Sequence, residues 1–577
     1  MIRPVEYTVL LGAPQTQTFQ IRMRIRDVDS KPFAVALPVW RQGKYAIINP
    51  ASSIRTVTAE SSGGKPLAIT KIDKTTWHVE PAGASEVIVG YTVYANSLND
   101  RTRHVDDTHA FLSGGTVFLY VTDRRNNPIV VNLDAPADWR VACGLKHEAG
   151  NPRVLLAPNY DVLIDSPIEI GLHEAFCFEV EGKPHDVAVW GDVQIDSEKI
   201  ERDFAKIIRT EAAIFGDLPY ERYVFILHVA PGLRGGTEHL NSTVMQMPQR
   251  AFEDEGQYKV LLSLTAHEMF HTWNVKRLRP AALRNVDLSR ENYTDLLWFC
   301  EGTTSYYDEL IPVRAGFVTP EAYLQTLAES IYQRRARPAT LVQSVAESSF
   351  DAWIKFNTSS PDDVNAVVSY YDSGSIVSLL FDLELRRRSG NRASLDTVMR
   401  TMYERFPAEG PGFTVNDLID TATRLSGFRF DQFFARYIYG TQRLPFEDLF
   451  DVVGLEMAAK DNAPHPYIGL QLQDEDGACV VRSVLSDGPA YLAGVNPGDK
   501  VISLNGRSFK SADLMAYVDR QMAPGDTVWL QVMRRNRMRR IEFSLETKMN
   551  PRWNIVRIAS PAPEQKAAYT SWLGVDF

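Results

Sequence analysis

The sequence predicts a multidomain α+β protein with three structural regions. Short runs that alternate apolar and polar residues, broken by turn residues, fill residues 1–185 and predict an N-terminal β-sandwich-like domain. Helical periodicity dominates residues 186–455, which predicts a mainly helical domain. Short alternating strands return in residues 460–548, and residues 549–577 form a tail too short for a domain. A chain of 577 residues is long enough for several cores, since single cores stop growing at about 250–300 residues.

The individual elements follow from local patterns. In the first region, strands are predicted at YTVLL (7–11), FQIRMRI (19–25), EVIVGYTVYA (86–95), GTVFLYV (115–121) and HDVAVW (185–190). In the second region, a strand is predicted at 223–230, and helices are predicted at 197–215, 259–280, 293–310, 320–335, 394–406 and 414–427. A further helix is predicted to begin near Ser369 and to run to about Arg388.

The composition fits a large soluble enzyme. Hydrophobic residues make up 44% of the chain and charged residues 23%, which is ordinary for globular proteins. The formal net charge is −10, which disfavours nonspecific binding to nucleic acid. The N-terminus lacks the apolar core of a signal peptide, and no run reaches the about 18 apolar residues of a membrane span. The sequence therefore predicts a cytoplasmic protein with neither a nucleic-acid partner nor a membrane span.

Two histidines four residues apart, His267 and His271, lie in the apolar helical segment at 259–280. Residues with this spacing share one face of a helix, so both imidazoles can reach one metal ion. Glu268 lies between them and can handle the proton of a water molecule. This is the H-E-x-x-H arrangement of zinc hydrolases. It predicts one catalytic Zn²⁺ per chain.

A catalytic zinc usually takes three protein ligands and keeps a position for water. Glu301 is the predicted third ligand, because it follows the apolar run Leu296–Phe299 in a second helical segment. A glutamate with such a flank is expected to be buried, and a buried carboxylate needs a partner. Asp308 and Glu309 are competing candidates, although their flanks are less apolar.

Two more segments carry residues that suit a peptidase site. Gly235 and Gly236 follow the strand predicted at 223–230, and a glycine pair lets the backbone approach a ligand closely. The neighbouring Glu238 can hold a cation, such as the ammonium group of a substrate. Tyr370 and Tyr371 open a helix, and a tyrosine hydroxyl can donate to a forming oxyanion. The spacing alone does not rank the two tyrosines.

The C-terminal region resembles a PDZ domain. The run GPAYLAGVNPGDKVISLNG contains the short helix, turn and following strand of that family. PDZ domains bind peptide ends by adding a strand to a sheet edge. Ile468, Gly469 and Leu470 occupy the place of the carboxylate-binding loop and the groove strand. The resemblance therefore implies a peptide or protein C-terminus as a partner, and the alternative is a packing module whose groove is unused.

The tail has two interpretations. It can fold back on the body of the protein. Alternatively, its last residues, Gly574 to Phe577, can dock in a PDZ groove, because they end in an apolar residue with a free carboxylate.

Taken together, these motifs resemble metallopeptidase family M61, the glycyl aminopeptidase type. The resemblance rests on HEMFHTWNVKRLRP, WFCEGTTSYY, GGTEHLNS and YYDSG, and it runs nearly end to end. Members are gluzincins with an N-terminal β-domain, a thermolysin-like catalytic domain and a C-terminal PDZ domain. The resemblance implies a zinc-dependent aminopeptidase that acts on peptides with a free N-terminus, with Gly or Ala as the expected N-terminal residue.

More distant similarity to aminopeptidase N-like enzymes implies two further roles. Glu238 corresponds to the glutamate that anchors the substrate amine, and Tyr371 is preferred over Tyr370 as the oxyanion donor. The chain departs from that pattern at Ser373, where the relatives have lysine, and at His239, where they have asparagine.

Three classes of function compete. The first is the zinc aminopeptidase, and the second is a zinc endopeptidase on the same scaffold. Faster cleavage of N-blocked than of free-amine substrates would distinguish the endopeptidase. The third is a binding or scaffold protein that works through its PDZ domain and has a vestigial metal site. The presence of all the expected zinc-site residues argues against this third class.

Overall fold

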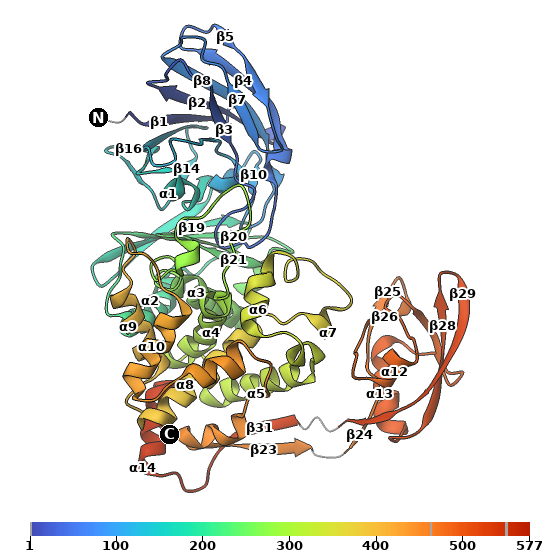
Figure 1. Cartoon of the computed structure of the whole chain (residues 1–577). Coiled ribbons are helices and arrows are strands. Elements are labelled where there is room, and N and C mark those ends of the chain that lie inside the picture. Colours follow the sequence, from blue (N-terminus) through green and yellow to red (C-terminus); the bar gives the residue numbers. More distant parts are fainter. Residues whose placement is uncertain (1–2, 462–463, 549–551) are drawn as a thin grey trace. The chain divides into compact units, whose positions relative to one another are not determined.

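Strands make up most of the N-terminal region of the computed structural model, which describes residues 3–461, 464–548 and 552–577 (Figure 1). The predicted alternation is visible in β2 (Thr18–Arg26), where every second side chain from Phe19 to Ile25 is buried. The largest sheet has the order β15 (Lys146–Glu148), β16 (Asn151–Ala157), β13 (Ile129–Asp134), β1 (Val5–Leu10), β2, β8 (Glu86–Tyr94), β4 (Ile54–Ser61) and β5 (Pro66–Leu67). The prediction of a β-rich N-terminal region is confirmed.

Two smaller sheets complete this region. One has the order β14 (Arg140–Cys143), β17 (Ile168–Gly171), β11 (His109–Leu112), β10 (Arg103–Val105) and β9 (Asn96–Ser97), and the other has β12 (Tyr120–Val121), β3 (Phe33–Ala36), β7 (Thr76–Val79) and β6 (Ile69–Lys71). The strand predicted at 115–121 is wrong over most of its length, because a 3-10 turn occupies Gly114–Thr116. A Cβ on Gly114 would lie 2.9 Å from the Cα of Ile164, so glycine allows this close approach of two backbones.

A five-stranded sheet follows in the chain. Its order is β18 (Glu174–Val180), β19 (Lys183–Gly191), β20 (Tyr223–Val229), β22 (Ser242–Met247) and β21 (Gly235–Glu238). Every residue of β20 is buried, and β20 runs parallel to both its neighbours. The helices α2 (Ser197–Phe215) and α3 (Glu255–Phe270) pack against each other, and α3 also contacts β21 and β22. These elements belong to a first compact unit, residues 1–293 with 399–414.

Helix α3 is displaced from the helix predicted at 259–280. It begins after Asp254, whose side chain accepts a hydrogen bond from the backbone N–H of Gln257. It ends at Phe270, and the Trp-Asn-Val-Lys-Arg segment continues as turns. In these turns the backbone N–H of Lys276 donates to the carbonyl of His271. The backbone therefore satisfies its hydrogen bonds outside a helix after the second histidine.

Helices dominate the following region, as predicted. They are α4 (Thr303–Arg314), α5 (Pro320–Ala336), α6 (Val345–Phe350), α7 (Asp363–Ala366), α8 (Asp372–Ser389), α9 (Leu395–Arg405), α10 (Val415–Ser426) and α11 (Asp431–Phe433). Two π-helical turns lie at Trp298–Gly302 and Phe434–Ile438. Residues 294–398 and 415–577 form the second compact unit. Within the described residues, no helix combines the length and the apolar character that a membrane crossing requires.

Short helices connect the longer elements. One of them, α1 (Tyr160–Ile164), is a short α-helix. Besides Gly114–Thr116, the described residues include 3-10 turns at Pro14–Thr16, Pro50–Ser53, Gln249–Ala251, Ala281–Leu283, Pro338–Leu341, Asp351–Trp353, Phe446–Asp448 and Phe450–Val453.

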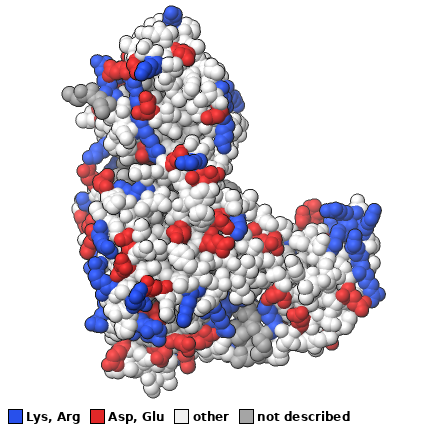
Figure 2. Space-filling model, in the orientation of Figure 1, with Lys and Arg blue, Asp and Glu red and all other residues white. Residues whose placement is uncertain are grey.

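The C-terminal region has the PDZ fold that the sequence predicts. Its sheet has the order β25 (Leu470–Glu475), β26 (Ala478–Val484), β27 (Lys500–Leu504), β28 (Thr527–Arg534) and β29 (Arg537–Ser544), with helices α12 (Pro489–Leu492) and α13 (Ser511–Gln521). Two short strands, β24 (His465–Tyr467) and β30 (Glu546–Lys548), pair antiparallel with each other. The basic run at 533–540 forms the exposed end of the β28–β29 hairpin, where blue side chains gather in Figure 2.

The tail folds back on the second unit, although residues 549–551, with which it was predicted to begin, lie outside the described residues. Strand β31 (Arg552–Arg557) pairs with β23 (Leu455–Asp461), and helix α14 (Pro563–Leu573) follows. The buried indole of Trp572 donates from Nε1 to the hydroxyl of Tyr306 over 2.9 Å. The ring of Phe577 lies 5.0 Å from the ring of Tyr569. The chain end is thus packed on its own helix, in line with the interpretation that the tail folds back.

Candidate active site

The two histidines of the H-E-x-x-H motif face each other at the end of α3. Their Nε2 atoms lie 3.1 Å apart. The Nδ1–H of His271 donates to the backbone carbonyl of Asn274 over 2.7 Å, which leaves the Nε2 of His271 as a lone-pair donor. Two ring nitrogens this close need a proton or a cation between them. A second hydrogen bond that fixes the tautomer is typical of metal-bound histidine. The geometry therefore fits a metal ion.

Glu268 is held by packing against a neighbouring strand. Its side chain is 4% exposed. A Cβ on Gly236 of β21 would lie 2.2 Å from Oε1 of Glu268, so no larger residue fits there without displacing the carboxylate. The sequence predicts that this glycine approaches a ligand. In the structure, Gly236 also makes room for the Glu268 side chain.

Glu238, at the end of β21, lies against a loop of the N-terminal region. A Cβ on Gly43, whose φ is +81°, would lie 2.8 Å from both carboxylate oxygens of Glu238. Arg41 is buried in the same loop. Burial lowers the pKa of the Arg41 guanidinium, and the nearby Glu238 carboxylate opposes that shift. Sequence reasoning missed both loop residues, because nothing in their spacing links them to β21.

The strand β21 is also fixed by a turn at 99–102 of the N-terminal region. The hydroxyl of Thr237 donates to Asp100 over 2.7 Å, and the guanidinium of Arg101 donates to the carbonyl of Gly236 over 3.2 Å. Asp100 is buried and forms an ion pair with Arg101. The residue after Glu238, His239, contacts Asp165, which also pairs with Lys276. The position of the Gly235–Glu238 segment is thus determined by residues distant in sequence.

In the second unit, Glu301 lies within the π-helical turn Trp298–Gly302 and is 2% exposed. Single π-helical turns occur frequently at functional sites. A Cβ on Gly302 would lie 2.5 Å from both the Cα of Gly374 and the carbonyl oxygen of Tyr370. A Cβ on Gly374 would in turn lie 2.9 Å from the Cα of Gly302. The segments that carry Glu301 and the tyrosine pair therefore pack backbone to backbone.

The two tyrosines of this segment differ in burial. Tyr370 is 2% exposed, and its ring lies 4.4 Å from the ring of Phe356. Tyr371 is half-buried, and its ring is 5.6 Å from that of Phe356. The partial exposure of Tyr371 leaves it more accessible to a substrate than Tyr370.

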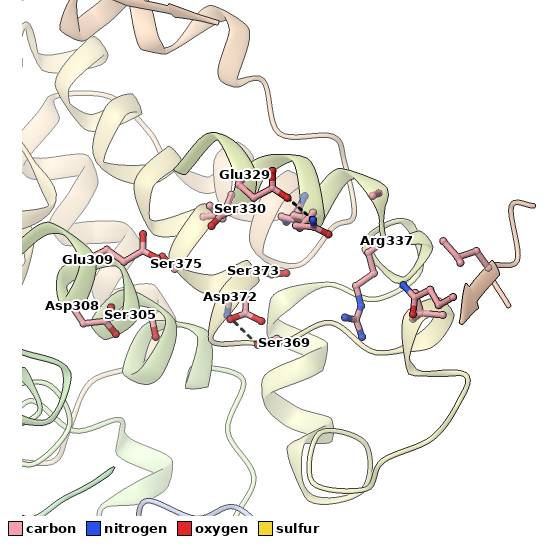
Figure 3. A pocket seen from close by; sticks show the side chains of 17 residues that line it. Ser305, Asp308, Glu309, Glu329, Ser330, Arg337, Ser369, Asp372, Ser373 and Ser375 are labelled. Carbon is pink, nitrogen blue, oxygen red and sulfur yellow. Dashed lines mark hydrogen bonds between the residues drawn. The ribbon is translucent and has the colours of Figure 1, made fainter. Parts of the chain in front are cut away.

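A cavity of about 470 Å³ opens beside the start of α8 (Figure 3). Asp308, Glu309, Glu329 and Asp372 line it, with several serines and the guanidinium groups of Arg334 and Arg337. Burial, with the nearby Asp308 and Asp372 carboxylates, raises the pKa of Glu309 to about 8. The two competing ligand candidates, Asp308 and Glu309, thus lie on the wall of this cavity, whereas Glu301 is more deeply buried.

The predicted PDZ groove residues contribute to the core of the domain, and they lie at or next to β25, an edge strand of its sheet. Ile468 and Leu470 are buried in the apolar core of the domain. Gly469 has a φ of +75°, and a Cβ there would lie 2.6 Å from the Cα of Gly488. Among the described strands of this sheet, β25 pairs with β26 alone, so its other edge is available for a further strand.

Three protein-family models match the chain. Residues 6–172 match the Peptidase M61 N-terminal domain, and residues 260–377 match the M61 glycyl aminopeptidase model. Residues 466–545 match the PDZ domain model. The M61 matches include the histidine pair, Glu268, Glu301 and both tyrosines. No curated protein matches the chain in sequence.

Solved structures also match the chain, and the first of them shares its fold. An aminopeptidase N family protein from Idiomarina loihiensis is 28% identical and has a TM-score of 0.91, over 99% of this chain and 100% of that one. An M1 zinc metallopeptidase from Deinococcus radiodurans is 13% identical with a TM-score of 0.48, over 77% of this chain and 95% of that one. Yeast LTA4 hydrolase in complex with bestatin is 14% identical with a TM-score of 0.47, over 77% of this chain and 68% of that one.

Proposed function

We propose that this chain, whose residues 6–172 and 260–377 match the M61 N-terminal and M61 glycyl aminopeptidase models, is a metallo-aminopeptidase that uses zinc to release small N-terminal residues, Gly or Ala, from peptides. The observation that carries the zinc proposal is the 3.1 Å separation of the His267 and His271 Nε2 atoms, with the His271 Nδ1–H committed to Asn274. The catalytic domain in this proposal is residues 186–455.

In this proposal His267, His271 and Glu301 hold one Zn²⁺. Two imidazoles and a carboxylate are an established donor set for catalytic zinc. Glu301 is preferred over Asp308 and Glu309, which lie on the cavity wall. When bound, zinc would lower the pKa of a coordinated water and polarise the scissile carbonyl.

Glu268 is the proposed general base. It accepts a proton from the attacking water and later delivers that proton to the leaving amine. Contact with Gly236 limits the movement of its carboxylate. A proton acceptor held in one position needs no reorganisation at the moment of reaction, which supports this role.

Tyr371 is the proposed donor to the carbonyl oxygen as negative charge develops on it. Its half-buried position supports this assignment, whereas Tyr370 is packed on Phe356. Tyr370 is the second candidate and is proposed to position the segment next to the substrate.

Glu238 is the proposed anchor for the substrate ammonium group, with Gly235 and Gly236 providing the backbone beside it. A buried carboxylate at the end of β21 can pair with a cation. Arg41 and Gly43 lie close to this carboxylate, so they limit the space next to it. A restricted site supports the proposal of a small N-terminal residue.

The PDZ domain is proposed to bind the C-terminus of a peptide or protein along β25, with Ile468, Gly469 and Leu470 forming the loop and strand of the groove. The unpaired edge of β25 within the described sheet supports this role.

The test compares Gly- and Ala-arylamides with their N-acetylated forms, on protein whose metal content is measured, with and without chelator. We expect bound zinc, cleavage of free-amine substrates and loss of activity on chelation. Faster cleavage of the acetylated substrates would contradict the aminopeptidase proposal and favour an endopeptidase.

The Glu238→Gln variant tests the amine anchor separately. We expect its kcat/KM to fall much more for free-amine than for N-acetylated arylamides. An equal loss on both substrates would contradict the proposed role. Glu253→Gln is the matched control, because Glu253 is an exposed glutamate of the same unit.

A further inference from the structure

A second histidine cluster lies in the first unit, in the β10–β11 hairpin of the N-terminal region. His104 is on β10, Asp106 is in the turn and His109 begins β11. The ligand atoms of these three side chains all lie within 4.8 Å of one another. The Nε2 of His104 is 3.1 Å from Oδ2 of Asp106, and the two imidazole rings are 5.1 Å apart. Nothing in the proposed aminopeptidase mechanism uses this cluster.

The hairpin turn fixes the carboxylate of Asp106. Its Oδ1 accepts hydrogen bonds from the backbone N–H groups of Thr108 at 2.8 Å and His109 at 3.1 Å. The hydroxyl of Thr108 donates to the same oxygen over 2.6 Å. Since Oδ1 is fully engaged by the turn, Oδ2 is the oxygen presented to the histidines.

The ring of His109 is fixed in the same way. It stacks on the indole of Trp190, with ring centroids 3.8 Å apart. Its Nδ1 lies 2.9 Å from Oε1 of Glu169. The His109 side chain is fully buried, and its Nε2 has no hydrogen-bond partner among the described residues. The Nδ1 of His104 is likewise buried without a partner there.

Glu169 belongs to a polar chain behind His109. Its Oε2 lies 3.0 Å from Nε2 of His228, whose Nδ1 lies 3.2 Å from the amide nitrogen of Gln246. Burial by itself would raise the pKa of Glu169, but the two histidines outweigh it and hold that pKa below its usual value. A carboxylate that accepts from the far nitrogen of a histidine is the arrangement that orients a metal-bound imidazole.

We propose that His104, Asp106 and His109 bind a divalent transition-metal ion, with one ring nitrogen from each histidine, Oδ2 of Asp106, and Glu169 as the orienting carboxylate. Two imidazoles and a carboxylate suit Zn²⁺ and leave a position for water. The side chains of His104 and Asp106 are 14% and 32% exposed, which gives the ion a route from solvent. The site goes beyond the proposed catalytic zinc and is independent of it.

The position of the site predicts a structural role. His109 is in the N-terminal sheet, whereas Trp190 and His228 are on β19 and β20 of the five-stranded sheet. An ion at His109 would therefore strengthen the contact between these two sheets. A hydrogen-bonded cluster without an ion would give the same contacts to Glu169 but would leave the buried His109 Nε2 unpaired.

The test measures zinc per chain in the full-length protein after dialysis against buffered Zn²⁺. Four forms are compared: wild type, His104→Gln, Asp106→Asn and His147→Gln, where His147 is an exposed histidine of the same region. We expect His104→Gln and Asp106→Asn to contain one zinc ion fewer per chain than wild type and His147→Gln. We also expect zinc to raise the Tm of wild type by more than that of the His104→Gln form.

A His267→Gln form separates the two sites. It is expected to lose arylamidase activity and one zinc ion, whereas His104→Gln keeps activity, and the double variant loses both ions. Circular dichroism checks that each form is folded. Equal zinc content in wild type, His104→Gln and Asp106→Asn would overturn the proposal. That outcome would leave the catalytic zinc assignment unchanged, because only His267→Gln reports on it.

Discussion

The residues of the proposed active site belong to two compact units that are built differently. In the first unit, α3 presents His267, Glu268 and His271 within five consecutive residues, and β21 packs Gly236 against Glu268. In the second unit, Glu301 lies in a π-helical turn and Tyr371 comes before α8, and these segments meet through Gly302 and Gly374. The spacing of side chains on a helix positions the residues of the first unit, whereas a close contact between two backbone segments positions those of the second.

The surroundings of the two sets of residues also differ: Glu268 is tightly packed, whereas the segment after Tyr371 borders a cavity. Glu268 is buried against the backbone of Gly236, so its position is fixed. The segment after Tyr371 contributes Asp372 and Ser373 to an acidic cavity. The proposed general base is therefore held tightly by its neighbours, whereas the proposed oxyanion donor precedes residues that line an acidic cavity. Four substitutions test this contrast.

The largest effect on activity is expected from Glu268→Gln in the first unit. If Glu268 is the general base, this substitution should lower kcat by about 10²–10⁴-fold without changing the zinc content, because glutamine keeps the shape but cannot accept the proton. Arylamide kinetics and metal analysis measure the two quantities. Glu255→Gln, at the exposed start of the same helix, is the matched control. Near-normal turnover in Glu268→Gln would rule out its proposed role.

The next largest effect on activity is expected from Tyr371→Phe in the second unit. Loss of one donor to a forming oxyanion typically lowers kcat by about 10²–10³-fold. Tyr370→Phe, one residue earlier, should cost far less, because its ring packing on Phe356 survives. Steady-state kinetics of both variants decide between them. A larger loss in Tyr370→Phe would exchange the two roles.

A comparable or smaller effect is expected from Gly236→Ala. The new methyl group would lie 2.2 Å from Oε1 of Glu268 and must displace that carboxylate. Displacing a catalytic group by about 1 Å can cost about 10²-fold in rate. We expect kcat to fall with little change in zinc content. Gly12→Ala is the control, since a Cβ at Gly12 meets nothing within 4 Å. Equal activity in both variants would show that the contact does not position Glu268.

The smallest effect is expected from Glu309→Gln, and it appears in stability. The folded protein keeps Glu309 protonated up to a pKa of about 8, whereas the unfolded chain ionises it near the usual glutamate value. The raised folded-state pKa therefore makes the free energy of unfolding fall as pH rises between these two values. Glutamine removes this pH-dependent contribution of Glu309 to the free energy of unfolding. The variant should therefore gain stability relative to wild type as the pH rises from about 5 to about 8.

Thermal unfolding at several pH values measures this change. Ser330→Ala is the control, because Ser330 lines the same cavity and carries no titratable group. A difference in Tm between Glu309→Gln and wild type that stays constant with pH would show that Glu309 does not titrate as proposed.

Local patterns account for the parts of the protein that the sequence predicts. The i, i+4 spacing of His267 and His271 places both on one face of any helix, so their convergence needs no tertiary information. The alternation in β2 likewise predicts which side chains are buried, because successive residues of a strand face opposite sides. The PDZ turn and strand pattern is similarly local, and it is confirmed by the fold and by the family match.

Contacts between distant segments decided the rest. The sequence left Asp308 and Glu309 as competitors of Glu301, and the structure separates them by burial. It gave no sign that Gly236 would accommodate Glu268, or that Gly43 would approach Glu238.

The cluster of His104, Asp106 and His109 with Glu169 also depends on tertiary structure, since Glu169 lies on β17, which pairs with β11. A sheet brings together residues whose separation in sequence depends on loop lengths and strand order. Helical spacing therefore determined the proposed metal-binding pair from the sequence alone. The surroundings that fix each carboxylate were decided by how strands and loops pack.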